Sequence, residues 1–439
     1  MASKWSRATL STLVSSLEAG VSVNSNDRPP NTGELGVLKT SAISGGTFNP
    51  NESKTVLPAE RSRVCTCVTA KGIIVSRMNT PELVGESALV DDDFPNLFLP
   101  DRLWLMMVQD ERCQARWLSH FLRSSISRRF IAVSATGTSG SMKNLPKPRF
   151  LAMPVDVPPL PEQRAIAAVL DTIDDAIQKT EQIIAKLQQV KQGLLHDLLT
   201  RGIDDNGELR DPDRHPEQFQ DSPLGKIPKG WRAESLRSLV TSAVDGPFGS
   251  ALKSEHYVPQ PGVRLVRLQN IGSGEFIDHD HAWISQRYAE TLRRHDAVSG
   301  DVLVASLGDE NHPYGRACVF QDGSWAIVKA DCFRLRPTGF MNSDFLAASL
   351  NIDVYHRPLR GLAQGVTRDR VNLGNLLRVR LPVPSREEQN SLINMVDSLQ
   401  RRITCEQNRA QKLRSTKAGL SEDLLSGRVR TTSLPGFSA

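Results

Sequence analysis

The sequence predicts an α+β protein in which two tandem-duplicated α/β domains are each followed by one long helix. Three observations support this prediction. Two stretches of about 40 residues place apolar side chains at alternating spacings of three and four, which is typical of a coiled-coil seam. These stretches match each other, without a gap, at an offset of 226 residues. The roughly 150 residues before each stretch contain short β-branched runs separated by Gly, Pro, Asn and Asp.

The first long helix is predicted over residues 161–201, because no proline or glycine interrupts the periodic pattern between Pro161 and Gly193. At about 1.5 Å per residue, this helix is a rod of roughly 50 Å. A rod with an apolar seam needs a partner helix that covers the seam. The predicted seam residues are Ile166, Leu170, Ile173, Ile177, Thr180, Ile184, Leu187, Lys191, Leu194 and Leu198.

The chain supplies that partner itself, as a second helix predicted over residues 387–428. Its seam residues are Leu392, Val396, Leu399, Ile403, Glu406, Ala410, Leu413, Lys417, Leu420 and Leu424. Outside the seam, Glu162-Gln163 recurs as Glu388-Gln389. Lys191 and Lys417 occupy equivalent polar positions, and three roles stay open for them. They fix the alignment of the two helices at some cost in stability, they extend their charges to solvent, or they face partner subunits.

The duplication extends over the domains that precede the helices. Trp5 matches Trp231 at the same offset, and Asn144-Leu145 aligns with Asn372-Leu373 after two-residue slips that suit variable loops. The predicted segments are a domain over 1–160, a helix over 161–201, a linker over 202–230, a domain over 231–386, a helix over 387–428 and a loose tail over 429–439. The linker is rich in Pro, Gly and Asp and shows neither the helical nor the strand periodicity of apolar residues. This indicates an irregular segment that crosses the surface.

The composition is typical of a globular protein, with 39% hydrophobic and 23% charged residues. A net charge of +5 permits a polyanionic partner without requiring one. No run approaches the length of a membrane span or a signal peptide, so we expect a cytoplasmic protein with no membrane partner. The six cysteines form no CxxC pair and His279-Asp-His281 lacks a third spaced ligand, so no metal site is expected.

Catalytic motifs are absent from the sequence. It contains no GxxxxGK[ST] phosphate loop, no GxGxxG after a strand, no HExxH and no GxSxG. The [DN]PP[YF] tetrapeptide of adenine methyltransferases is also missing. Together with the duplication, these absences favour a binding scaffold without catalytic residues or a cofactor of its own.

Basic residues recur near one place in each domain. Arginine and asparagine close to the glycine-rich loops 135–140 and 363–368 suit contacts to phosphates and base edges, which predicts double-stranded DNA as a partner. The candidate DNA-binding residues are Arg77, Arg128, Arg129, Lys143, Asn144, Arg316, Arg357, Arg360, Arg368, Arg370 and Asn372. Each of them alone is more simply a solvated surface residue, whereas the paired clusters favour DNA.

These features together resemble the specificity subunit of type I restriction–modification systems. The resemblance rests on PPLPEQ at the entry to the first helix, on GLLHDLLT near its end, and on the following RGIDDNGELR with the later DSPLGKIPKGW. The second helix carries the entry motif only in variant form, from Pro382 to Gln389. The resemblance covers essentially the whole chain.

The resemblance implies two target recognition domains, each reading one half of a bipartite, asymmetric duplex. It also implies that the two helices pair as an antiparallel coiled coil with pseudo-twofold symmetry and dock two methyltransferase subunits, with restriction and motor subunits joining the same core. S-adenosylmethionine, ATP and Mg would then belong to the partner subunits. Because recognition domains diverge strongly within this family, the resemblance assigns no base-contacting residue.

Two alternatives belong to other functional classes. A non-catalytic coiled-coil adaptor would bind proteins rather than DNA through its globular domains, and a pulldown that retained protein without nucleic acid would support it. A stand-alone nuclease or methyltransferase with a degenerate site would show magnesium- or S-adenosylmethionine-dependent turnover by the isolated chain.

Overall fold

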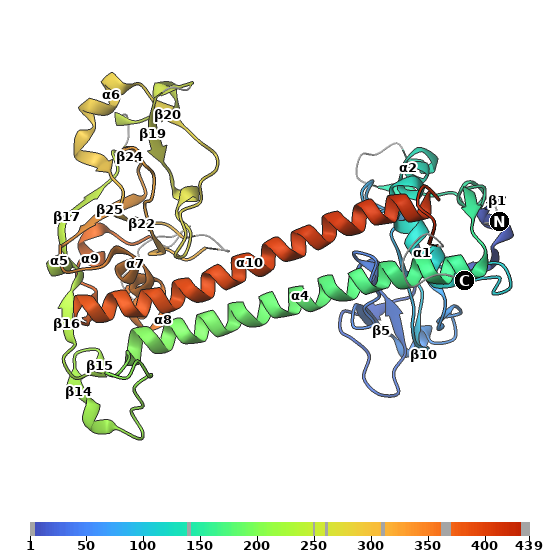
Figure 1. Cartoon of the computed structure of the whole chain (residues 1–439), viewed down its shortest axis with the longest axis horizontal. Helices are drawn as coiled ribbons and strands as arrows, with labels where there is room; N and C mark the ends of the chain where they lie inside the picture. The colour runs from blue at the N-terminus through green and yellow to red at the C-terminus, as the bar shows by residue number, and fades with distance from the viewer. Residues whose placement is uncertain are drawn as a thin grey trace. The chain divides into compact units, whose positions relative to one another are not determined.

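The computed structural model describes residues 5–137, 142–248, 251–259, 262–308, 312–360 and 370–431. The chain divides into two compact units, each holding one globular part and portions of both long helices (Figure 1). The first unit comprises Met1–Gln182 and Gln407–Ala439, and the second comprises Ile183–Glu406. The predicted fold class is confirmed, because both globular parts mix sheets with helices and share one construction.

Two sheets form the globular part of the first unit. The four-stranded antiparallel sheet has the order β2-β11-β7-β9, with bounds Val14–Ala19, Leu103–Val108, Ile73–Ser76 and Ser87–Leu89. The five-stranded sheet has the order β3-β5-β4-β10-β6, with bounds Ser25–Asn26, Ser53–Val56, Gly36–Leu38, Phe94–Phe98 and Cys67–Val68. Only β4 and β10 run parallel in it. Two short pairs are added, β1 (Ser6–Thr9) with β13 (Pro154–Val157) and β8 (Met78–Asn79) with β12 (Lys143–Asn144).

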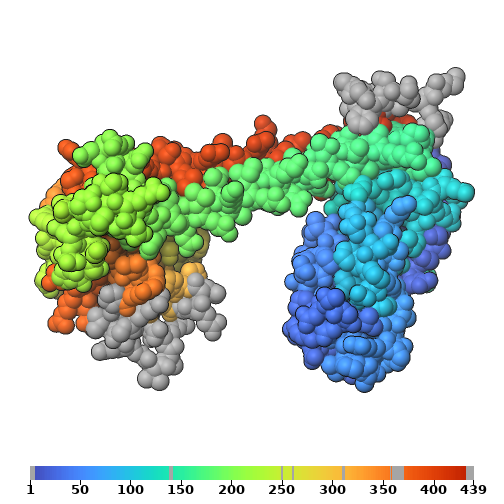
Figure 2. Space-filling model, turned by 90° about the horizontal axis from the view of Figure 1, so that it is seen from below, coloured from blue at the N-terminus to red at the C-terminus, as the bar shows by residue number. Residues whose placement is uncertain are grey.

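Three helices cover the four-stranded sheet of the first unit. They are α1 (Ala115–Arg123), α2 (Ser125–Ser134) and α3 (Lys147–Leu151). The Gln114 side chain caps α1 by accepting a hydrogen bond from the Trp117 backbone N–H. Trp117 is fully buried, and the sheet and helices share one core with the start of α4 (Leu160–Arg201). Figure 2 shows these blue-to-cyan residues packed against the first half of α4.

The second unit repeats both of these sheets. Its four-stranded sheet has the order β17-β25-β22-β23, with bounds Val240–Asp245, Cys332–Pro337, Val302–Ala305 and Ala317–Val319. Its five-stranded sheet has the order β18-β20-β19-β24-β21, with bounds Tyr257–Val258, Trp283–Ile284, Val263–Val266, Ala326–Val328 and Asp296–Ala297. Here β19 and β24 are the parallel pair. The short pair β16 (Arg232–Ser235) with β26 (Arg380–Val383) corresponds to β1 with β13.

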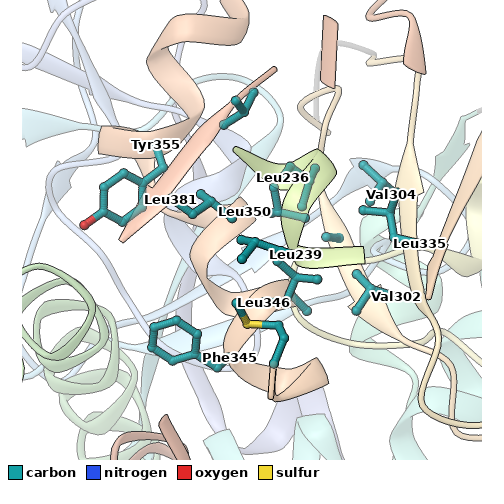
Figure 3. Close-up of a cluster of buried hydrophobic side chains, with 14 of the residues drawn as sticks. Leu236, Leu239, Val302, Val304, Leu335, Phe345, Leu346, Leu350, Tyr355 and Leu381 are labelled. Carbon is teal, nitrogen blue, oxygen red and sulfur yellow. The ribbon is translucent and has the colours of Figure 1, made fainter. Parts of the chain in front are cut away.

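The helices of the second unit are α5 (Leu236–Leu239), α6 (Gln286–Thr291), α7 (Ser343–Asn351), α8 (Asp353–Arg360) and α9 (Leu373–Leu376). Asn342 caps α7 by accepting from the Phe345 backbone N–H, as Gln114 does for α1. Figure 3 shows Leu346 and Leu350 of α7 in one cluster with Leu239 of α5 and with Val302 and Leu335 of the sheet. Period-3.6 and period-2 apolar faces thus meet in one core.

Backbone hydrogen bonds define which residues of the two units are equivalent. The Leu145 N–H donates to the Arg77 carbonyl at 2.8 Å, and the Val371 N–H donates to the Ser306 carbonyl at 3.0 Å. Leu145 therefore corresponds to Val371, and Asn144 corresponds to Arg370. The sequence alignment of Asn144 with Asn372 was wrong by two residues. Its cause is a chance Asn-Leu dipeptide, because Asn372 caps α9 in the second unit.

The long helices are α4 and α10 (Arg386–Leu425), and they run antiparallel within each unit (Figure 1). In the first unit, Asp174 of α4 pairs with Lys417 of α10, and Glu181 pairs with Arg414. In the second unit, Lys191 Nζ donates to Gln400 Oε1 at 2.6 Å. Both seam lysines therefore contact the facing helix, which favours the alignment role among the three left open.

Burial along the helices follows the seam residue by residue. Between 178 and 193 on α4, the only residues that are not exposed are Thr180, Ile184, Leu187 and Lys191. Between 397 and 420 on α10, the residues that are not exposed are Leu399, Ile403, Glu406, Ala410, Leu413, Lys417 and Leu420. The remaining seam positions, Ile166, Leu170, Ile173, Ile177, Leu194, Leu198, Leu392, Val396 and Leu424, are buried or half-buried nearer to the globular parts. The seam is the contact face in each unit.

Two segments predicted to be irregular are more ordered than expected. Within 202–230, β14 (Phe219–Ser222) and β15 (Gly225–Pro228) form a hairpin, and Phe219 and Ile227 are buried in the second unit's core. This hairpin was not predicted, because its strands alternate weakly between apolar and polar residues and contain proline and glycine. In the predicted loose tail, Thr431 is buried, while residues 432–439 lie outside the described part. No helix among the described residues is long and apolar enough to cross a membrane.

Candidate nucleic-acid interface

Each long helix is docked to the globular part of its unit by a Glu-Gln pair. In the first unit, Glu162 accepts hydrogen bonds from Trp5 Nε1 at 3.0 Å and from Arg430 Nε at 2.7 Å. In the second unit, Glu388 accepts from Trp231 Nε1 at 2.9 Å and from Arg210 Nη1 at 2.7 Å. Both carboxylates are thus held between an indole and an arginine. The sequence showed these residues as internal identities without revealing their role.

The glutamines bind backbone groups of the domain that precedes each helix. Gln163 Oε1 accepts from the Gln114 N–H at 2.7 Å, and Gln389 Oε1 accepts from the Asn342 N–H at 2.7 Å. In each case the amide nitrogen donates back to a proline carbonyl, of Pro158 at 2.9 Å and of Pro384 at 3.1 Å. These buried amides fix the angle at which each helix leaves its domain.

Polar side chains gather in the first unit where the residues after β7 meet the strand that leads into α3. Asn144 pairs with Met78 across β8 and β12. The Arg77 Cζ atom lies 5.8 Å from the centroid of the Trp104 ring. Among the described residues, Arg77 Nε and Asn144 Oδ1 are buried polar atoms without a hydrogen-bond partner. Lys143 Nζ donates to the Gly137 carbonyl at 2.8 Å. We call Arg77, Lys143 and Asn144 the first polar site.

The equivalent place in the second unit carries Arg370 on the strand and Ser306 after β22. Arg370 Nη2 lies 3.0 Å from Asp331 Oδ1, and its Cζ atom lies 5.2 Å from the centroid of the Phe248 ring. Phe248 is 48% exposed, which is high for a large apolar side chain. We call Phe248, Asp331 and Arg370 the second polar site. Sequence reasoning missed Phe248 and Asp331, although an aromatic residue in a Gly-Pro-Phe-Gly run was a detectable signal.

The chain reaches Phe248 through a tight approach at Gly246. A Cβ atom at this position would lie 2.0 Å from the Lys329 carbonyl oxygen, so only glycine lets the two backbones come this close. Gly20 is placed in the same way at the end of β2, where a Cβ atom would lie 1.6 Å from the Leu99 carbonyl oxygen. Two residues further on, Ser22 of the first unit stands where Phe248 stands in the second. The backbone path is shared and the side chain differs.

Three candidate DNA-binding residues are used inside the protein instead. Arg316 is 4% exposed and donates to the carbonyls of Leu268, Ile271, Leu307 and Pro313. Arg128 donates to the carbonyls of Glu82 and Val84, so it braces the loop after β8. Asn372 caps α9 through the Asn375 N–H at 2.8 Å. These side chains support loops and a helix end, and we do not retain them as DNA contacts.

The remaining candidates lie on helices or outside the described residues. Arg129 is exposed on α2, where its Nε donates to the Ser125 carbonyl at 3.2 Å. Arg357 is exposed on α8 and pairs with Asp353 at 2.9 Å. The side chain of Arg360 and all of Arg368 lie outside the described part, as does part of each glycine-rich loop. The structure thus brings together Arg77, Lys143 and Asn144 in one unit and places Arg370 at the equivalent point of the other.

The cysteines form no disulfide bonds. Burial raises the pKa of the Cys113 and Cys318 thiols to about 12 and raises that of Cys332 further. Within the described residues, no group of three His, Cys, Asp or Glu side chains could hold a metal ion. His281 instead pairs with Asp278 at 3.0 Å. The arrangement suits recognition of a polyanion through arginine, lysine and amide groups.

Comparison with known proteins agrees with this chemistry. Residues 39–189 match the family model described as the type I restriction modification DNA specificity domain. The chain is 22% identical to the type I restriction enzyme MjaVIII specificity subunit of Methanocaldococcus jannaschii, over 72% of this chain and 70% of the relative. It is 23% identical to the EcoBI specificity subunit of Escherichia coli, over 69% of this chain and 62% of the relative.

Solved structures share the fold. A chain from a study of the assembly and conformational transition of the type I R-M system superposes with a TM-score of 0.59 at 17% identity, covering 97% of this chain and 98% of that one. The type I restriction–modification S subunit from M. genitalium gives a TM-score of 0.53 at 14% identity, with 96% of each chain covered.

The two repeated units and the matched domain are the features expected of a DNA-recognition subunit. The chain is similar over most of its length to type I restriction–modification specificity subunits, and residues 39–189 match the DNA specificity domain of that family.

Proposed function

We propose that the chain reads a bipartite, asymmetric duplex, with one half-site contacted by each unit. The observation that carries this proposal is the duplication of a polar site on one backbone framework with different side chains, Asn144 in one unit and Arg370 in the other. Two identical readers would select a symmetric target. Two readers with different contact residues select different half-sites.

The proposed contact residues are the candidates that remain after Arg128, Arg316 and Asn372 are set aside. In the first unit they are Arg77, Arg129, Lys143 and Asn144, and in the second they are Arg357 and Arg370. Arg360 and Arg368 remain proposals from the sequence alone. Arginine and lysine supply phosphate contacts that set affinity, while arginine and asparagine also reach base edges.

We further propose that the paired helices dock two methyltransferase subunits and position the restriction subunits. Ile183 and Val190 are exposed on α4 outside the seam, seven residues apart, and Met395 is exposed on α10. Apolar side chains on the outer faces of a helix pair are typical of contact with another protein. The proposed function places the protein in the cytoplasm together with the DNA that it reads.

Selection from a pool of random duplexes tests this function. The chain is co-purified with the methyltransferase subunit of its system, and bound duplexes are sequenced. We expect one motif with two different halves at a fixed spacing, and binding that falls steeply as salt rises. Recovery of duplexes without any shared motif, or of one symmetric motif, would contradict the proposal. Capture of a protein partner with no DNA binding would instead support the adaptor alternative.

A further inference from the structure

We infer that Asn144 and Arg370 are equivalent base-reading residues, with Asn144 selecting adenine in one half-site and Arg370 selecting guanine in the other. This inference rests on the proposed function and names the side chains that make the two half-sites different. It concerns one position in each unit, which the backbone hydrogen bonds identify independently of any sequence alignment.

The equivalence is set by three matching contacts around each residue. The residue after it donates its N–H to the carbonyl of Arg77 or of Ser306. The residue itself pairs with the next position along that segment, Asn144 with Met78 and Arg370 with Leu307. In the same framework, Gly85 donates to the Ser76 carbonyl and Gly315 donates to the Ala305 carbonyl, both at 2.7 Å. The two side chains therefore start from the same point of the same strand pair.

The donor and acceptor of the Asn144 amide match those on the major-groove edge of adenine. An asparagine side chain accepts from adenine N6 through Oδ1 and donates to adenine N7 through Nδ2. In the described structure, Asn144 Oδ1 is buried and has no hydrogen-bond partner. Because it gives up no hydrogen bond, rotation of this amide toward a base loses only its present packing. A buried acceptor without a donor is uncommon, and a DNA base would satisfy it.

The guanidinium of Arg370 carries the complement of guanine, whose O6 and N7 accept two parallel N–H groups. Its side chain is 40% exposed, so the fork is accessible. Asp331 holds one edge of the fork, and the half-exposed Phe248 ring lies against its face. These two contacts hold the plane of the guanidinium in place before DNA arrives, which lowers the cost of a bidentate contact.

The neighbouring carboxylate also distinguishes a base contact from a phosphate contact. Asp331 offsets the charge of Arg370, so the pair attracts a phosphate weakly and repels it at close range. The geometry of the fork toward a guanine edge is unaffected by this neutralisation. In the first unit, Arg102 stands at the position of Asp331 and is exposed, so phosphate attraction there comes from Arg77, Arg102 and Lys143. The neutral Asn144 is left for the base.

The same duplex selection, repeated with variants in the complete complex, tests the assignment. Arg370→Asn is expected to lower the preference for guanine about 10- to 100-fold at one position of one half-site and to leave the other half-site unchanged. Asn144→Arg is expected to abolish the adenine preference at one position of the opposite half-site. Arg370→Lys keeps the charge but loses the fork, so it should bind DNA and still lose guanine selectivity.

Arg129→Gln and Arg357→Gln are the matched controls, because both residues are exposed arginines on helices of the same units. They are expected to weaken binding to all duplexes evenly without changing the motif. An unchanged motif for both Arg370 variants, with a bipartite motif for the wild type, would overturn the inference and leave the proposed function standing. Changes by Arg370→Asn and Asn144→Arg in the same half-site would also overturn it. A wild-type complex that enriches no motif would overturn the proposed function itself.

Discussion

In the first unit the strand that leads into α3 carries Asn144, and in the second unit the same strand carries Arg370. The surroundings differ as well, with Ser22 and Arg102 in one unit and Phe248 and Asp331 in the other. The backbone hydrogen bonds that hold these positions are the same in both. The duplicated domain therefore has a fixed framework and a variable polar site.

The opposite holds where each globular part meets the long helices. Trp5, Glu162 and Gln163 of the first unit recur as Trp231, Glu388 and Gln389, with the same partners and distances that agree within 0.1 Å for the indole contact. Both units receive the same helix pair, so both need the same docking residues. The side chains that face the proposed DNA half-sites are under no such constraint. Under the proposed function, this division lets one domain design serve two different half-sites.

The largest expected effect is a loss of stability that is confined to one unit, caused by truncating a buried leucine of a long helix. Leu198 of α4 is buried in the second unit's core, and its counterpart Leu424 of α10 is buried in the first unit's core. Leu198→Ala should destabilise the second unit by about 2–5 kcal/mol, and Leu424→Ala should destabilise the first by a similar amount. Hydrogen exchange followed by segment measures each unit separately.

Gln188→Ala on the exposed face of α4 is the control for these leucine variants, and it should change stability by less than about 0.5 kcal/mol. Equal loss of protection in residues 14–108 and 240–337 after Leu198→Ala would show that the two cores unfold together. The division of the chain into two units would then be wrong as a description of its stability.

The sequence predicted the helices and the duplication because both depend on regular spacing. Seam positions from Thr180 to Leu198 follow from a 3.5-residue repeat that only a paired helix satisfies. The order of the strands did not follow, because the strands are as short as two residues and pair across loops of variable length. The hairpin of β14 and β15 escaped for the same reason.

The polar sites were predictable only in part. Composition and pairing of basic residues drew attention to Lys143, Asn144 and Arg370. The sequence could not show that the Arg316 side chain donates hydrogen bonds to four backbone carbonyls, because these carbonyls belong to loops up to 48 residues away. The sequence also could not show that Asn144 corresponds to Arg370. Loops of different length obscure the alignment of the two domains, and a chance Asn-Leu match suggested a different alignment.

A smaller effect is expected at the docking carboxylates. Glu162→Gln removes the ion pair with Arg430, and Glu388→Gln removes the ion pair with Arg210. Each should lower the stability of its own unit by about 1–3 kcal/mol, because a buried hydrogen bond to a charged group is lost. Glu181→Gln, which breaks an exposed pair with Arg414, is the matched control and should cost less than about 1 kcal/mol.

The contacts of Glu162 with Trp5 and Arg430 also predict that the stability of the first unit depends on pH. Burial raises the pKa of this carboxyl, but the hydrogen bonds and charge of Arg430 and Trp5 outweigh it and hold the pKa below its ordinary value. A lowered folded-state pKa adds stability above the unfolded value near pH 4.3, and this stability is lost as the pH falls through the folded value. Chemical unfolding from pH 7 to pH 3 should therefore show a steeper acid loss in the wild-type first unit than in Glu162→Gln. Parallel stability–pH profiles for the wild type and Glu162→Gln would contradict a stabilising role of the ionised Glu162.

The smallest expected effect on stability comes from a single residue at the contact between a domain helix and a long helix, which is basic in the first unit and acidic in the second. In the first unit Arg116 lies 3.6 Å from Asp171, whereas in the second unit the equivalent residues are Asp344 and Asp397. Partial burial and the nearby Asp397 charge raise the pKa of Asp344. Asp344→Arg should stabilise the second unit by about 0.5–1 kcal/mol, because it replaces repulsion by attraction.

The reciprocal Arg116→Asp should destabilise the first unit by a similar amount. An acid with a raised folded-state pKa favours the folded state below its unfolded pKa and loses this contribution as the pH rises through the folded value. The gain from Asp344→Asn, measured by chemical unfolding, should accordingly grow between pH 4 and pH 7. A gain that is constant over this range, or an Arg116→Asp variant as stable as the wild type, would show that this charge pair does not contribute to the difference between the two units.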